Sequence, residues 1–154
     1  MYYYYREGRC DIKVIICGPR DFHDFKVVCE AIEASGMEIT EVVSGAAKGV
    51  DTLGEDWAAN NDIPVTKFPA EWKNLKQTGA RVKENSYGKY NANAGLFRNK
   101  LMAEYAGEGG GCIAIDTGSG GTSNMINNAK ENGLTVFTYD PDVFVDDKDY
   151  GYIF

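Results

Sequence analysis

Four short segments of the chain contain groups that proteins use to hold a phosphate: three combine glycines with arginine, lysine or hydroxyl side chains, and one is an arginine followed by an asparagine. They are Gly18-Pro19-Arg20, Ser44-Gly45-Ala46-Ala47-Lys48-Gly49, Arg98-Asn99 and Gly118-Ser119-Gly120-Gly121-Thr122. Glycines let backbone N–H groups approach an anion closely, and a helix N-terminus adds free donors and partial positive charge. Arginine binds phosphate or carboxylate through two parallel hydrogen bonds. These segments predict a site for a phosphate-bearing ligand.

The elements that must position these segments alternate between strand and helix. Apolar runs rich in β-branched residues predict strands at 12–17, 38–43, 63–68, 112–116 and 134–139. Apolar residues recur at helical spacing between these runs. Strands separated by single helices form a parallel sheet with helices on both faces. The expected fold class is therefore α/β, a Rossmann-like, doubly wound, mainly parallel sheet of about five strands.

The glycine-rich segments follow predicted strands, at the edge where an open α/β sheet binds its ligands. Trp72 follows the third strand, Asp116 ends the fourth, and Arg98 begins a predicted helix. None of the segments has the GxGxxG or GxxxxGK[ST] pattern, so neither a usual dinucleotide dehydrogenase nor a P-loop NTPase is indicated. The convergence at one edge is the main evidence for a ligand site.

Composition narrows the class of protein. The 154 residues suit one domain, 1–154, with a core over about 12–139 and an acidic tail at 140–154. The net charge of −7 argues against a general binder of nucleic-acid backbones. One histidine and four cysteines without a CxxC pair favour neither a metal site nor a disulfide framework, and no cofactor is expected. We expect no membrane span and a cytoplasmic location.

Two segments stay open to interpretation. Residues 69–97 are polar and glycine-containing, and they carry several lysines and arginines. We expect a long loop there, acting as a lid or partly disordered. The four tyrosines at 2–5 fit an edge strand, an oligomer contact or a sticky tail.

The same motifs resemble the SLOG superfamily, which includes the Lonely-Guy cytokinin-activating phosphoribohydrolases and the DNA-processing protein DprA. The resemblance rests on Gly18-Pro19-Arg20, the run SGAAKGVD at 44–51, Arg98-Asn99 and Gly121-Thr122. Pro69, Trp72, Ala94-Gly95 and Met102 are similar to the YspA-like branch, and the resemblance covers roughly 12–139. It implies a Rossmann-like fold, a nucleotide-derived ligand and a homo-oligomer.

The pattern and the resemblance together define the expected site. The predicted ligand-binding residues are Gly18, Pro19, Arg20, Ser44, Gly45, Ala46, Lys48, Gly49, Trp72, Arg98, Asn99, Gly118, Gly120, Gly121 and Thr122. If the protein is an enzyme, the candidate catalytic residues are Arg98, Asp116 and Asp51. Lonely-Guy enzymes use a glutamate three residues after the threonine of their glycine motif, and this chain has Met125 there.

Three hypotheses for function follow. The first is a binding protein that senses or sequesters a nucleotide-derived ligand, with Trp72, Tyr87 or Tyr90 stacking on the base. The second is a hydrolase that cleaves an N-glycosidic bond in a nucleotide. The third, which the acidic charge disfavours, is a binder of single-stranded nucleic acid. The short chain and its inserted segment suit a phage or bacterial accessory protein.

Overall fold

A five-stranded parallel sheet forms the centre of the fold. The computed structural model describes residues 11–142, so the tyrosines at 2–5, Cys10 and most of the acidic tail lie outside the described residues. The strand order is β3-β2-β1-β6-β7. The strands are β1 (Lys13–Cys17), β2 (Glu41–Ser44), β3 (Val65–Lys67), β6 (Gly111–Ile115) and β7 (Thr135–Tyr139). All pair in parallel, which confirms the predicted Rossmann-like α/β class.

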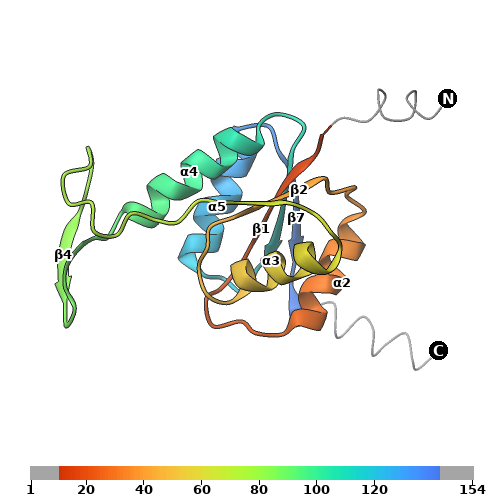
Figure 1. The fold of residues 1–154 in the computed structure, drawn as a ribbon, viewed down its shortest axis with the longest axis horizontal. Helices are drawn as coiled ribbons and strands as arrows, with labels where there is room; N and C mark the ends of the chain where they lie inside the picture. Colours follow the sequence, from red (N-terminus) through yellow and green to blue (C-terminus); the bar gives the residue numbers. More distant parts are fainter. Residues whose placement is uncertain (1–10, 143–154) are drawn as a thin grey trace.

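Helices cover both faces of the sheet (Figure 1). They are α2 (Phe25–Ser35), α3 (Val50–Asn60), α4 (Ala94–Ala106) and α5 (Gly120–Glu131). Alternate residues of β1 point to opposite layers: Ile15 packs in the core beneath α4 and α5, whereas Ile16 packs in the core beneath α2 and α3. Burial on both faces explains why the central strands are almost continuously apolar. None of the described helices has the length and hydropathy needed to cross a membrane.

Local signals set the beginnings and ends of the helices. The Asp24 side chain accepts a hydrogen bond from the backbone N–H of Val27 at 3.4 Å and caps α2, which ends at Gly36 in the left-handed conformation. The Ser119 side chain caps α5 in the same way, at 3.4 Å from the N–H of Thr122. Because α5 is the element that follows β6 in the chain, its start lies at the carboxyl edge of the sheet.

The segment 69–97 differs from the expected long loop. Strands β4 (Val82–Asn85) and β5 (Gly88–Asn91) form an antiparallel hairpin, and α4 already begins at Ala94. Figure 1 shows this hairpin projecting beyond the N-terminal end of α4, away from the main sheet. Every residue of β4 is exposed. A strand without a buried face has no alternation of apolar and polar residues, so periodicity could not predict the hairpin.

Candidate functional site

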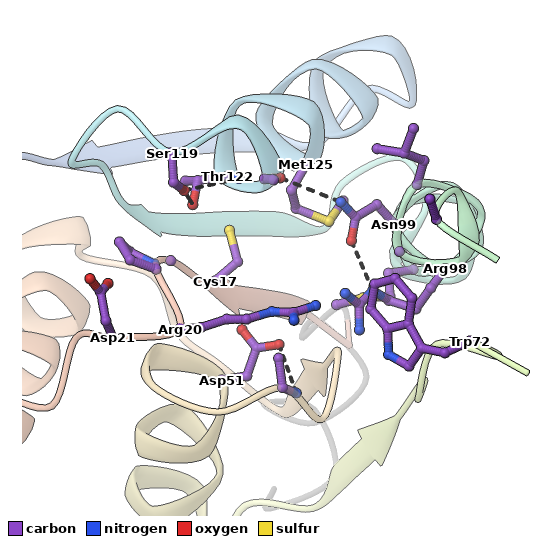
Figure 2. Close-up of a pocket in the computed structure, with 18 residues that line it drawn as sticks. Cys17, Arg20, Asp21, Asp51, Trp72, Arg98, Asn99, Ser119, Thr122 and Met125 are labelled. Atoms are coloured by element: carbon purple, nitrogen blue, oxygen red, sulfur yellow. Dashed lines mark hydrogen bonds between the residues drawn. The ribbon is translucent and has the colours of Figure 1, made fainter. Parts of the chain in front are cut away.

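A pocket of about 410 Å³ opens at the carboxyl edge of the sheet. Its wall includes the segment after β1, the first turn of α3, the segment after β3, the first half of α4 and the N-terminus of α5 (Figure 2). Of the residues predicted from sequence, the pocket is lined by Gly18, Pro19, Arg20, Asp51, Trp72, Arg98, Asn99, Gly121 and Thr122. Segments separated widely in sequence thus meet at one place.

A second hollow of about 410 Å³ adjoins the first and shares Arg20, Trp72 and Arg98 with it. Three further predicted residues, Gly45, Ala46 and Lys48, line this second hollow rather than the first. The predicted residues that line neither hollow are Ser44, Gly49, Asp116, Gly118 and Gly120. The Asp116 carboxylate instead accepts a hydrogen bond from the backbone N–H of Gly118 at 3.0 Å.

Arg98 joins three parts of the pocket wall. Its Nη1 donates to the carbonyl of Gly45 and, at 3.5 Å, to the carbonyl of Phe68, while its Nε donates to Asn99 Oδ1 at 2.9 Å. Burial lowers the pKa of the Arg98 guanidinium, and the nearby Asp51 carboxylate opposes that change. Arginine stays charged despite such shifts. The pocket therefore contains a cation held in place by backbone carbonyls.

Asn99 carries this network on to α5. Its Nδ2 donates to Asn124 Oδ1 at 3.0 Å and to the carbonyl of Gly121 at 3.4 Å. The backbone N–H groups of Gly120 and Gly121, in the first turn of α5, donate to no described residue. Free N–H groups at a helix N-terminus suit an anion. Gly121 lines the pocket, which places the N-terminus of α5 in the pocket wall.

Asp51 is a buried carboxylate in the pocket wall, 7% exposed. Burial raises its pKa from 3.8 to about 6, although a hydrogen bond from the N–H of Ala47 and the charge of Arg98 partly offset the effect. Neither arginine of the pocket forms an ion pair with this carboxylate within the described contacts. The arginine charges are thus not neutralised by direct contact, and they remain able to bind an external anion.

Gly45 and Ser44 position the charged groups. A Cβ on Gly45 would lie 2.6 Å from Arg98 Nη1 and 2.7 Å from Asp51 Oδ2, so only glycine allows both side chains to approach this segment. The Ser44 hydroxyl donates to Glu55 Oε2 at 2.6 Å and accepts from the N–H of Ala46 at 3.1 Å. Ser44 therefore holds the turn after β2 and does not face the ligand space.

Gly49 acts in the same indirect way, and its replacement tests the packing of the pocket wall. Its φ is +77°, and a Cβ there would lie 2.3 Å from the carbonyl oxygen of Pro19. We expect Gly49→Ala to lower the free energy of unfolding by about 3 kcal/mol, through left-handed strain and backbone overlap. Gly36→Ala is the control, since Gly36 has φ +68° but no atom within 4 Å of a Cβ. It should cost only about 1 kcal/mol. Equal losses in urea unfolding would contradict the overlap.

Trp72 and Arg20 form the outer wall of the pocket. The guanidinium carbon of Arg20 lies 5.1 Å from the Trp72 ring centroid, a cation–π contact. The carbonyl of Trp72 accepts a hydrogen bond from the N–H of Asn91 at 2.6 Å, which ties this wall to the hairpin. A Cβ on Gly95 would come within 3.2 Å of the indole, so the glycine leaves room for the ring. Figure 2 shows Trp72 and Arg20 facing the same space as Asp51.

Some pocket residues were not among the ligand-binding or catalytic residues predicted individually from the sequence. They are Cys17, Asp21, Ala47, Ala92, Gly95, Leu96, Met102, Ser119 and Met125. Ser119 had a usable signal, because serine before a helix is a preferred N-cap. The apolar residues carry no such signal, because apolar side chains occur both in a protein core and on the floor of a pocket.

The thiol of Cys17, one of these pocket residues, stays protonated. Its hydrogen bond with Cys112, 3.9 Å between the sulfurs, and its burial raise its pKa.

Residues 12–75 match the family model described as "YspA, cpYpsA-related SLOG family". No curated protein and no solved structure matches the chain significantly. The matched range contains Gly18-Pro19-Arg20, the turn after β2, Asp51 and Trp72. Arg98 and the N-terminus of α5, which complete the pocket, lie beyond it.

Proposed function

We propose that this chain, which belongs to the YspA-like branch of the SLOG superfamily by its residues 12–75, binds a nucleotide-derived phosphate ligand as a sensor or sequestering protein. One observation supports this most strongly. Arg20, Arg98 and Gly121, whose N–H donates to no described residue, line a single pocket of about 410 Å³. Charge-assisted hydrogen bonds from arginine, together with a helix N-terminus, form a strong phosphate site.

The base and ribose have a separate place in this proposal. The indole of Trp72 offers a flat face at the pocket entrance, where Arg20 now lies 5.1 Å from the ring centroid. A nucleobase stacks on such a ring, and the guanidinium of Arg20 then turns toward the phosphate. The pocket volume lies within the usual range for small-molecule sites, roughly 300–1,000 Å³.

A panel experiment tests the proposal. Thermal-shift measurements with nucleoside mono- and diphosphates, ADP-ribose and cyclic dinucleotides should identify stabilising ligands, which are then analysed by mass spectrometry after incubation. A ligand recovered intact supports a sensor or sequestering protein. A ligand recovered as free base and ribose phosphate supports a hydrolase. The absence of stabilisation by the whole panel, with inorganic phosphate also inactive, would overturn the proposed phosphate site.

Gly121→Val tests the role of the α5 N-terminus. No atom lies within 4 Å of a Cβ at Gly121, so the fold should tolerate the change, but the new side chain would enter the pocket. We expect binding of the nucleotide identified by the panel to weaken by about tenfold or more, because a methyl-bearing group displaces a hydrogen-bonded phosphate oxygen. Calorimetry measures this.

Gly120→Val is the matched control. Gly120 also has no atom within 4 Å of a Cβ, but it does not line the pocket. Equal losses of affinity in both variants would place the phosphate elsewhere.

A second candidate function, nucleotide N-glycoside hydrolysis, is favoured by Asp51. This buried carboxylate lies in the pocket beside Arg98, and its pKa near 6 suits a group that exchanges protons at neutral pH. In such a reaction the C1′–N bond breaks, its electron pair goes to the base, and water adds its oxygen to C1′ and a proton to the base. Asp51 would stabilise the cationic ribosyl centre or accept a proton from water. Asp116, the other sequence candidate, does not line the pocket.

Incubation in ¹⁸O-labelled water distinguishes the two functions. Hydrolysis would place the label in ribose phosphate, and Asp51→Asn would abolish this turnover while retaining ligand binding. Met125 lines the pocket at the position where Lonely-Guy enzymes have their glutamate, so this chain would have to rely on Asp51. Unlabelled, intact nucleotide after long incubation would exclude hydrolysis of that nucleotide.

A further inference from the structure

A basic hairpin projects from an acidic protein. We define the arm as residues 73–91, which include β4 and β5. The arm has five basic residues and one acidic residue, a net charge of +4, whereas the whole chain has a net charge of −7. The charge of the whole chain therefore does not describe this segment. A local cluster of one sign attracts partners of the opposite sign, whatever the net charge of the protein.

The basic side chains of the arm are accessible to a partner. All five are exposed, and none forms an ion pair with a carboxylate of residues 11–142: Lys73, Lys76, Arg81, Lys83 and Lys89. The only acidic residue of the arm, Glu84, lies opposite Lys89 in the hairpin register and forms no ion pair with it. Because no carboxylate occupies these cations, they can bind the phosphates of a polyanion.

The register of the hairpin confines its carboxylate to one face. Lys83 pairs with Tyr90, and Glu84 pairs with Lys89. Side chains alternate between the two faces of a strand, and residues directly opposite each other share a face. Lys83 and Tyr90 therefore share a face of the hairpin that has no acidic residue. Tyr87 at the turn is 96% exposed, so this face and the tip present only cationic, polar and aromatic groups to a partner.

The arm is held at its base and at its turn. Asn91 at the base is fully buried, and its N–H donates to the carbonyl of Trp72 at 2.6 Å. Its side chain accepts from the N–H of Arg81 at 3.1 Å. At the turn, the side chain of Asn85 accepts from the N–H of Tyr87 at 2.9 Å. A projection that is already ordered loses less conformational freedom when a partner binds.

The projection also separates the cations of the arm from the acidic body. Figure 1 shows the hairpin extending beyond the N-terminal end of α4, away from the main sheet. Each of its strands has four residues and spans about 13 Å, since a strand rises about 3.3 Å per residue. Interactions between exposed charges are screened over roughly 8 Å at physiological ionic strength. A polyanion at the tip is therefore largely screened from the carboxylates of the body.

We propose that the arm binds duplex DNA, entering the major groove as a two-stranded ribbon with its cations on the phosphates. The major groove of B-form DNA is about 12 Å wide and admits such a ribbon. Phosphate contacts position a protein on DNA without reading the sequence, so the binding has no strong sequence preference. No residue of the arm lines either of the two hollows beside Arg98, so this inference does not depend on the proposed ligand.

Duplex DNA fits the arm better than a single strand, duplex RNA or a protein does. Proteins that bind a single strand track it along a groove, whereas every residue of β4 is exposed on a projection. The major groove of duplex RNA is deep and narrow. A protein partner buries an apolar centre. The exposed large apolar side chains of the hairpin are only Val82 and Tyr87, and the others, Leu96, Leu101 and Tyr105, belong to α4.

Fluorescence anisotropy of a labelled duplex of about 20 base pairs, titrated with the full chain, tests the proposal. We expect a dissociation constant of roughly 1–100 µM at physiological salt, and a slope of about −3 to −4 for the logarithm of the binding constant against that of the salt concentration. Lys83→Gln/Lys89→Gln should weaken binding by about tenfold and reduce the slope by about 2. Lys26→Gln/Lys130→Gln, which removes two exposed cations from α2 and α5, is the matched control and should stay within about twofold.

Glu84→Gln provides a gain of binding, which misfolding cannot produce. The variant removes the only carboxylate of the arm, so we expect binding to strengthen by about twofold or more. The proposal is overturned by the absence of binding at low salt, by equal losses in the arm and control variants, or by failure of Glu84→Gln to strengthen binding. It is also overturned if the single strand, a duplex RNA of equal length or phosphatidylserine vesicles bind more tightly than the DNA duplex.

Discussion

Arg98→Ala is expected to weaken binding of a nucleotide phosphate by about 100-fold while the protein remains folded. The side chain contributes a fixed cation to the pocket, and a charge-assisted hydrogen bond to phosphate is worth about 1.5–3 kcal/mol. A 100-fold loss corresponds to about 2.7 kcal/mol, which lies within the range for one such bond. Calorimetry with the ligand found in the panel measures it, and circular dichroism with a melting curve verifies the fold.

The control for this variant is Lys100→Ala. Lys100 is an exposed cation on the same helix and does not line the pocket, so its removal changes the net charge equally without affecting the site. Affinity should then stay within about twofold of the original chain. If Arg98→Ala binds the ligand as tightly as Lys100→Ala does, the pocket is not the phosphate site.

Asp51→Asn is expected to stabilise the protein at neutral pH. The pKa of Asp51 is raised from 3.8 to about 6 by burial, so the folded state disfavours the charged form. The stability contribution of this group is fully present below about pH 4 and is lost as the pH rises through 6. A shift of roughly two pKa units corresponds to up to about 3 kcal/mol at pH 7. Asparagine removes the charge, and its oxygen can still accept from the N–H of Ala47.

The pH dependence makes this prediction specific. Urea unfolding of both chains at pH 7.5 should show the variant to be more stable, and at pH 4 the difference should nearly vanish. Asp56→Asn, an exposed carboxylate on the same helix, should change stability little at either pH. A destabilised Asp51→Asn variant at pH 7.5 would contradict the cost of the buried charge. A stabilising result would indicate that the chain retains an unfavourable carboxylate facing the pocket, as functional sites often do.

Several features of the fold followed from local sequence. The β-branched run at 12–17 predicted a buried strand because both faces of β1 are covered by helices, which removes any need for polar residues. The alternation of strands and helices then implied a parallel sheet. Gly18-Pro19-Arg20 and Gly121-Thr122 were predicted to approach each other because both follow strands of that sheet, and the structure brings them into one pocket.

The hairpin and the division of roles within the site depended on tertiary structure. Residues 82–91 carry no periodic signal, because every residue of β4 is exposed and β5 buries only its last residue, Asn91. Ser44 ends β2 and Asp51 follows the same strand, but the Ser44 side chain bonds to Glu55 whereas Asp51 lines the pocket. The pKa of Asp51 depends on the groups that surround it in space. The sequence shows that a carboxylate is present but does not show which groups bury it.

Sequence alone therefore determined the sheet and the edge at which the candidate ligand-binding groups gather. Apolar periodicity and glycine turns depend on residues that are close in sequence, so they can be recognised from the order of residue types. Only the tertiary structure decided which of those groups share the pocket, how Arg98 is held, and which apolar surface of α4 remains uncovered. Burial, charge and contact arise between segments far apart in the chain, so no local pattern records them.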